Sequence, residues 1–242
     1  MSDLLRDALN ETLVRNSHGQ VVEAIGSAIV SGKYPEGSIL PRDDALASQF
    51  GVSRTVLREA MKTLSAKGMI VARTRVGTRV CDRQRWNLFD AEVLVWHLDE
   101  YPDMGFLDQL FEMRLTMEPG AAAMAATRAT AEEITTLYSH AEAMRTADDD
   151  KAFAMADLAL HRAITKASGN VFMHSVVTLI EAALLIIFRL SSPASEPATQ
   201  QDVSAAHLRI IDAIARRDPA AAEQAMRDVI LYGQRRISGV VR

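Results

Sequence analysis

The chain contains very little cysteine, few aromatic residues and no long apolar run. Cys81 is the single cysteine in 242 residues, and aromatic residues make up 5% of the sequence. One cysteine cannot form an internal disulfide, which excludes a disulfide-stapled secreted domain and favours a reducing compartment. The most apolar stretch, residues 176–190, is interrupted by Glu181 and Arg189 and is too short to span a membrane. We therefore expect a buried helix there, no signal peptide, no membrane partner and a bacterial cytoplasmic location, at the nucleoid when bound to DNA.

The apolar and charged residues that are present have an uneven distribution. Hydrophobic residues make up 48% of the chain and are mostly Ala, Leu, Met and Ile, which suits helices. The net charge of −4 argues against nucleic-acid binding by the whole chain. However, residues 31–85 contain 11 Lys and Arg against 5 Asp and Glu, a net +6, whereas residues 86–242 contain 14 against 22, a net −8. A basic module joined to an acidic body indicates local binding of nucleic acid.

The basic module has the pattern of two helices joined by a glycine turn. Residues 43–50 predict a first helix, and Gly51 begins the short turn. Ser53 is suited to cap the second helix, because its hydroxyl can accept a free N–H of the first turn. Apolar residues then recur at helical spacing until Gly68 ends the helix. The pattern predicts a helix-turn-helix.

Basic side chains lie on the second helix and on the segment that follows it. Residues 69–80 predict two short strands with a turn near Gly77, a basic hairpin. A basic helix face is often only a solvated surface. Here it coincides with a glycine turn, an N-cap and an arginine-rich hairpin, which favours DNA binding. We expect Arg54, Thr55 and Arg58 to enter the major groove, where Arg pairs with guanine. Phosphate contacts are expected from Lys62, Arg73, Arg75 and Arg79.

The run LPRDDALASQFGVSRTVLREAMKTLSAKGMI, with GTRV after it, resembles the DNA-binding domain of GntR-type bacterial regulators. The resemblance implies a winged helix-turn-helix and a homodimer on palindromic double-stranded operator DNA. The family usually has LPSER, so an arginine that touches DNA in relatives is replaced by Asp44; Arg42 is a candidate substitute. The candidate DNA-binding residues are Arg42, Ser53, Arg54, Thr55, Arg58, Lys62, Arg73, Arg75, Gly77 and Arg79.

The rest of the chain predicts a mainly α protein with two domains. We expect the DNA-binding domain over residues 1–82 and an interdomain linker over residues 83–102. In that linker, we expect Trp86 and Trp96 to be buried against the second domain. They either only pack the linker in place or couple the two domains. Residues 103–242 predict an antiparallel all-helical bundle, without strands and with a proline-containing loop over residues 191–199. Residues 1–16 suggest a weak helix or arm. The bundle helices are expected over residues 104–126, 130–147, 149–168, 171–190, 201–216 and 218–238.

Four polar residues interrupt otherwise apolar faces of the expected bundle. Asp157 and His161 are four residues apart and share a helix face, while Arg114 and His207 lie on other helices. An Asp and two His converging in a bundle could hold zinc or another divalent metal, and an arginine could grip a carboxylate. Such an Asp/His pair can equally be a surface hydrogen bond, and a lone His can be a satisfied core residue.

Three segments, FEMRLTMEPGAAAMAATRAT, DLALHRAITKASGN and AHLRIIDAIARRDPAAAEQAM, resemble the FCD ligand-binding domain of the FadR branch of the same family. Metal-binding members use an Asp and three His. Asp157, His161 and His207 match three of these ligands, but Val229 stands where the last His would be. The resemblance therefore implies either a three-ligand zinc site or histidines that donate hydrogen bonds to the effector. Asn170 joins the candidate effector-binding residues.

The run RQRWNLFDAEVLVWHL is similar to a run in the sugar-acid regulators of this family. The similarity implies an aldonate such as galactonate as effector. Arg114 would then bind the carboxylate, and Asp157, His161 and His207 would bind hydroxyls or a bridging metal.

The function expected from these patterns is a ligand-responsive transcriptional repressor of a sugar-acid operon. A regulator that responds to a different small carboxylate, a metal-dependent enzyme and an architectural DNA-binding protein are the alternatives. The enzyme finds little support, because no paired carboxylate, Ser-His-Asp pattern or Gly-rich phosphate loop accompanies Asp157, His161 and His207. The residues alone leave open the effector, the operator sequence, the bound metal, repression versus activation and the helices of the dimer interface.

Overall fold

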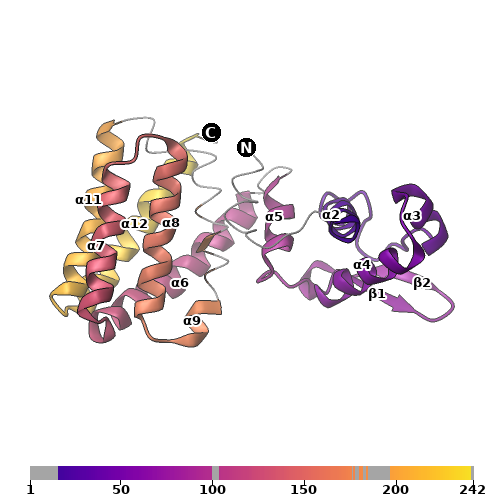
Figure 1. Ribbon diagram of the computed structural model, residues 1–242, viewed down its shortest axis with the longest axis horizontal. Coiled ribbons are helices and arrows are strands. Elements are labelled where there is room, and N and C mark those ends of the chain that lie inside the picture. The colour runs from indigo at the N-terminus through magenta and orange to yellow at the C-terminus, as the bar shows by residue number, and fades with distance from the viewer. Residues whose placement is uncertain are drawn as a thin grey trace. The chain divides into compact units, whose positions relative to one another are not determined.

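The computed structural model describes residues 16–99, 104–175, 177, 180–181, 184 and 197–240. The chain forms two compact units that divide between residues 102 and 103. Each unit is therefore described by itself (Figure 1). The expected arm at residues 1–16 lies outside the described residues except for Asn16, whose side chain caps the first described helix by accepting from Gly19 N.

The N-terminal unit is a helix-turn-helix followed by a two-stranded hairpin. Gly51 adopts a left-handed conformation with φ 63°, which ends the first helix of the motif and turns the chain toward the second. The strands pair antiparallel, from Ile70 opposite Val80 to Arg73 opposite Gly77. The elements are α2 (Ser17–Val30), α3 (Asp43–Phe50), α4 (Arg54–Ala66), β1 (Ile70–Arg73), β2 (Gly77–Val80), the 3-10 helix η1 (Arg83–Arg85) and α5 (Ala91–Asp99). The winged helix-turn-helix expected from the sequence is confirmed.

The segment expected to be a linker packs on the N-terminal unit over its described part. Trp86 and Trp96 are buried in the same hydrophobic core as α2 and α4. The Trp86 Nε1–H donates to the carbonyl oxygen of Cys81 at 3.0 Å. Trp96 lies so close to Gly26 that a Cβ there would be 2.4 Å from its ring. The sequence interpretation that placed these tryptophans against the second domain therefore differs from the structure, because the first unit already encloses them.

A buried lysine joins the end of α4 to the start of α5. The Nζ of Lys67 lies 2.6 Å from an oxygen of Asp90 and 2.6 Å from an oxygen of Glu92. The same atom lies 5.9 Å from the centre of the Trp96 ring. A buried cation needs such partners, and here two carboxylates supply them. This cluster, Lys67 with Asp90 and Glu92, is called the Lys67 clamp.

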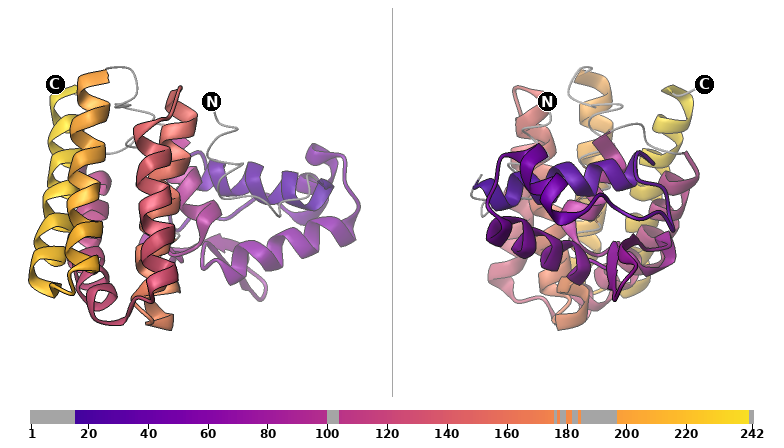
Figure 2. Two further views of the ribbon diagram at one scale, coloured as in Figure 1. Left: turned by 60° about the vertical axis from the view of Figure 1, so that its left-hand side comes forward. Right: turned by 90° about the vertical axis from the view of Figure 1, so that its right-hand side faces the viewer.

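The C-terminal unit is a helical bundle, and no strand occurs in its described residues. Helices α7, α8, α11 and α12 stand side by side in Figures 1 and 2. Helix α6 packs against α8, α11 and α12, and α7 packs against α8 and α11. Short connections make sequential neighbours antiparallel. The bounds are α6 (Met104–Arg128), α7 (Ala131–Arg145), α8 (Asp150–Ala167), α9 (Val171–Ser175), α11 (Pro197–Ala215) and α12 (Pro219–Val240).

The bundle agrees with the expected one except at one helix start. Helix α11 begins at Pro197, inside the stretch expected to be a loop over residues 191–199. Proline fits the first turn of a helix, because the N–H that it lacks would have no helical partner there. Of the helix expected over 171–190, residues 171–175, 177, 180–181 and 184 are helical, and the remaining positions lie outside the described residues. Among the described helices, none has the length and apolarity needed to cross a membrane.

Candidate functional site

Helix α4 presents a basic face to solvent and an apolar face to the core. The Ser53 hydroxyl caps it by accepting the Val56 N–H at 3.3 Å. Leu57, Ala60 and Leu64 are fully buried, which fixes the rotation of the helix about its axis. The opposite face carries the exposed candidate residues Arg54, Thr55, Arg58 and Lys62.

Two of these cations have carboxylate partners. Arg54 Nη2 lies 3.0 Å from Asp44 Oδ1, and both side chains are about three-quarters exposed, at 74% and 73%. Lys62 Nζ lies 2.8 Å from Glu59 Oε1, within the same helix. The basic face is therefore partly compensated before any DNA binds.

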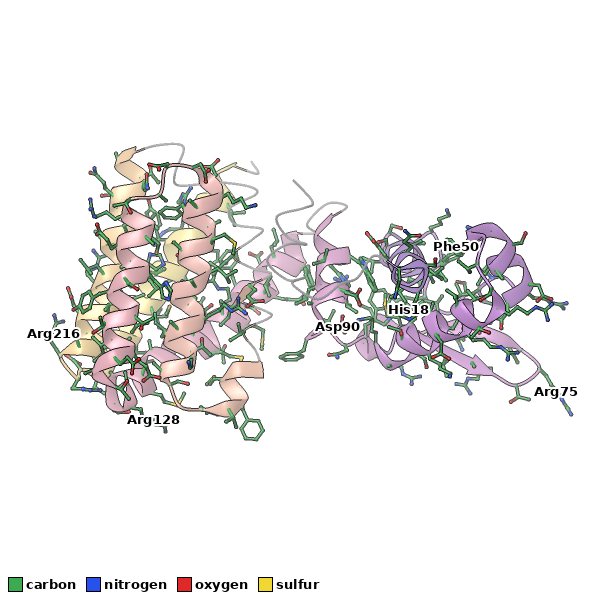
Figure 3. The ribbon with its side chains drawn as sticks, in the orientation of Figure 1. His18, Phe50, Arg75, Asp90, Arg128 and Arg216 are labelled. Carbon is green, nitrogen blue, oxygen red and sulfur yellow. The ribbon has the colours of Figure 1, made fainter. Side chains whose placement is uncertain are left out.

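The hairpin carries three further candidate arginines. Arg73, Arg75 and Arg79 are exposed. Arg75 and Gly77 adopt positive φ values of 64° and 111° at the turn. Figure 3 shows Arg75 at the tip of the hairpin, with its side chain extending away from the unit. Arg42, also exposed, lines a groove together with Arg75 between the start of α3 and the hairpin. These residues form the candidate DNA-binding surface together with the basic face of α4.

The second candidate site lies inside the bundle, where α8 meets α11. Asp157 and His161 on α8 and His207 on α11 are at most 2% exposed. One ligand atom from each residue lies within 4.8 Å of the other two. His207 Nε2 is 2.8 Å from Asp157 Oδ1 and 3.3 Å from His161 Nε2. The helices thus bring together the three residues expected to bind a metal.

The hydrogen bonds of the two Nδ1 atoms determine whether the Nε2 atoms that face Asp157 donate or accept. His161 Nδ1 donates to Glu118 Oε2 at 2.5 Å, and His207 Nδ1 donates to the carbonyl oxygen of Val203 at 2.8 Å. In the neutral imidazoles the two Nε2 atoms are therefore acceptors. Asp157 Oδ1 has no well-aligned hydrogen-bond donor despite its burial. Three acceptors that face one another need a shared cation, either a metal ion or a proton.

Glu118, which the sequence interpretation missed, compensates Arg114. Arg114 Nε donates to Glu118 Oε1 at 2.5 Å, and both side chains are 2% exposed. Burial alone would raise the pKa of Glu118, but the Arg114 guanidinium and His161 outweigh burial and lower the pKa from 4.5 to about 2. Glu118 therefore stays ionised and holds both Arg114 and His161 in place. Its signal in the sequence was the i,i+4 spacing from Arg114.

In the Asp157–His207 pair, each residue shifts the pKa of the other toward its charged form. Burial would raise the pKa of Asp157, yet the nearby His207 and His161 lower it. Burial would lower the pKa of His207, yet the Asp157 carboxylate raises it. A proton shared on His207 is thus the alternative to a metal ion at this site.

A pocket opens over the three ligand residues. The space above them, about 430 Å³, is continuous with solvent at the mouth of the pocket. Arg114 lines it, as does one face of α12 with Val229, which the sequence interpretation had singled out, and Tyr232, Gly233 and Arg236, which it had not. In the sequence these four residues stand at i, i+3, i+4 and i+7, a spacing that places them on one helix face and could have identified that face. Val229, at the position where the resemblance implies a histidine in metal-binding members, contributes an apolar side chain to the lining.

Asn170 is not among the residues that line this pocket. Its Oδ1 accepts the Phe172 N–H at 3.0 Å, so it caps the short helix α9 beyond the end of α8. The expectation that Asn170 binds effector therefore differs from its position in the structure.

Comparisons with known proteins match both units. Residues 18–80 match the model of bacterial regulatory proteins of the gntR family, and residues 109–231 match the FCD domain. YieP, an HTH-type transcriptional regulator of Escherichia coli K12, is 36% identical over 208 residues, covering 85% of this chain and 88% of YieP. The galactonate operon transcriptional repressor of the same strain is 31% identical over 229 residues, covering 93% and 98%. A solved GntR structure from Streptococcus agalactiae has a TM-score of 0.50 and 26% identity, covering 90% and 99%.

Proposed function

Because this chain belongs to the gntR family of bacterial regulatory proteins and carries an FCD domain, we propose that it represses a sugar-acid catabolic operon until its effector binds. Its family and relatives are transcription regulators rather than enzymes. One observation carries the effector assignment: the pocket combines two arginines with three buried acceptors that need a cation. Operator binding assigns the protein to the cytoplasm, at the nucleoid.

The N-terminal unit docks on the operator through α4. Arg54, Thr55 and Arg58 reach base edges in the major groove, because they lie exposed on the first turns of the helix. A homodimer places two copies of α4 on the two halves of a palindrome. Contacts to the sugar-phosphate backbone, which position the protein without reading sequence, come from Arg42, Ser53, Lys62, Arg73, Arg75, Gly77 and Arg79.

Asp157, His161 and His207 hold a divalent ion such as zinc. The donor set fits, since one carboxylate oxygen and two imidazole nitrogens converge, and Glu118 orients His161 as an outer hydrogen-bond partner. The ion supplies a positive centre that attracts an anionic ligand. With Val229 in place of a fourth ligand, one position stays available for water or an effector oxygen.

Charge around the pocket favours an anionic effector. Arg114 and Arg236 are offset by Glu118 and Asp157, so a bound divalent ion leaves a net positive charge. Arg236 on α12, which lines the pocket, and the metal bind the carboxylate. The Tyr232 hydroxyl suits the hydroxyls of a sugar acid. The similarity to the galactonate operon repressor supports an aldonate. A different small carboxylate is the alternative.

A thermal-shift screen of the metal-stripped full-length protein tests the effector class. Aldonates, uronates and other small carboxylates are added with and without zinc. A ligand at 100 times its Kd adds about 2.7 kcal/mol to the stability, which raises the Tm. Stabilisation by an aldonate only in the presence of zinc supports the proposal. A response to other carboxylates but to no sugar acid would remove the sugar-acid assignment.

Two substitutions test the residues of the pocket. Arg236→Ala retains operator binding and loses release by the effector, because release requires effector affinity to differ between two states. Val229→His restores the missing histidine and raises zinc affinity, measured by competition with a chelating dye. An unchanged effector response in Arg236→Ala excludes that arginine from the site, and unchanged zinc affinity in Val229→His argues against the proposed metal position.

A further inference from the structure

Asp44 introduces a negative charge into the candidate DNA-binding surface. It lies in the first turn of α3, and its Oδ1 is 3.0 Å from Nη2 of Arg54, the first residue of α4. The ion pair therefore joins the two helices of the helix-turn-helix across the turn at Gly51. A second ion pair on this surface, between Glu59 and Lys62, lies within a single helix.

Folding stability does not account for this pair. Both side chains are about three-quarters exposed, and exposed ion pairs contribute little or nothing measurable to stability. On a surface that meets phosphates, a carboxylate also opposes the general attraction to DNA. The geometry instead points to an effect of Asp44 on the residue it contacts, Arg54.

An arginine that reads a base depends on the orientation of its guanidinium. The group pairs with guanine through two coplanar N–H donors directed at O6 and N7. On a flexible stem it can reach several bases or a phosphate. The contact with Asp44 uses Nη2, and a guanidinium has five N–H donors, so the remaining donors are available to a base. A carboxylate beside Arg54 thus limits its orientations before DNA binds.

We propose that Asp44 is a positioning residue that determines base specificity, by holding the Arg54 guanidinium so that it reads one guanine in each half-site. This inference rests on the major-groove docking of α4 proposed above.

Selection from a randomised pool of double-stranded oligonucleotides tests the proposal with the full chain. The wild type enriches a palindrome, and Arg54→Ala identifies the guanine position that depends on Arg54. At that position a bidentate arginine is worth a preference of roughly 5- to 150-fold. Asp44→Ala lowers this preference at the same position by up to about fivefold, without exceeding the loss seen in Arg54→Ala. Asp44→Ala in the Arg54→Ala background causes no further loss, because Asp44 acts through Arg54.

Asp43→Ala is the matched control. Asp43 lies beside Asp44 in the same first turn and is exposed. Removing its charge strengthens binding to all duplexes to a similar extent and leaves base preference unchanged, whereas Asp44→Ala changes preference. The Tm of each variant is measured and compared with that of the wild type, so that unfolding is not mistaken for a change in base preference.

Two outcomes overturn the proposal while leaving the docking intact. In one, Asp44→Ala selects the same sequences as the wild type with the same preference. In the other, it changes preference only at a position that Arg54→Ala does not affect, which means that Asp44 contacts a base itself. A wild type that enriches no sequence contradicts the docking of α4, and with it the role of Asp44.

Discussion

On helix α4 the functional charges lie in solvent, whereas on α6 and α8 they lie in the interior. Arg54 is 74% exposed with its partner Asp44, while the Arg114–Glu118 pair is 2% exposed. Both are contacts between an arginine and a carboxylate, but water screens the first and is excluded from the second. The difference teaches that an arginine–carboxylate pair contributes little to stability where it is exposed and is costly to break where it is buried.

Glu118→Gln should produce the largest effect, because it leaves Arg114 as an uncompensated charge in the interior. We expect a loss of about 3–5 kcal/mol in the free energy of unfolding. Glu142→Gln is the matched control, since Glu142 pairs with Arg145 along α7 with both side chains 59% exposed. That change should cost at most about 1 kcal/mol. Chemical denaturation measures both, and equal losses would show that burial does not distinguish the pairs.

Acid should weaken the metal-free protein through the same carboxylate. The pKa of Glu118 is about 2 when folded against an ordinary value of 4.5, so the unfolded state binds its proton first as pH falls. The stability from Glu118 is therefore complete above pH 4.5 and is lost as pH falls toward 2, by up to about 3 kcal/mol. The difference in unfolding free energy between the wild type and Glu118→Gln should narrow over this interval. A constant difference would contradict the lowered pKa.

Arg58→Ala should have its effect on DNA binding alone. Loss of a base contact should weaken operator binding by roughly 1–3 kcal/mol per half-site. The free energy of unfolding should stay within about 0.5 kcal/mol of the wild type, because the side chain is exposed. Fluorescence anisotropy with the selected duplex measures the affinity. Arg145→Ala, an exposed arginine on the other unit, should bind that duplex normally. Normal binding by Arg58→Ala would contradict the docking of α4.

Lys62→Ala should have the smallest effect. A phosphate contact carries no sequence information, so affinity should fall to a similar extent for all duplexes and the salt dependence should drop by about one unit of slope. Since Lys62 is already paired with Glu59 at 2.8 Å, part of its attraction is compensated in the free protein. Measurement of Kd against salt concentration tests this. A change in base preference would assign Lys62 to base reading.

The fold could be predicted well because its signals are local. The glycine turn, the Ser53 cap and the alternation of apolar and basic positions on α4 all depend on residues close together in the chain, and each is confirmed. The bundle followed from helical periodicity. The start of α11 at Pro197 was missed because proline is compatible with both a loop and a first helical turn.

The pocket could be predicted only in part because its residues come from distant helices. Asp157, His161 and His207 were identified as a set and do converge. Glu118 and the α12 face with Tyr232 and Arg236 were missed, since spacing along one helix does not reveal which other helix it faces. Trp96 was assigned to the wrong neighbour for the same reason: its partner, Gly26, lies 70 residues earlier.

The Lys67 clamp determines where the domain boundary lies when domains are exchanged between relatives. Because Lys67 binds Asp90 and Glu92, and Trp86 and Trp96 complete the first core, α5 is structurally a member of the DNA-binding module. A chimera that joins this module to the effector domain of a relative should therefore cross over after Asp99. A junction at residue 82 would remove two tryptophans from the core and leave a lysine buried without its carboxylates. Recombination within the family should tolerate the first junction and reject the second.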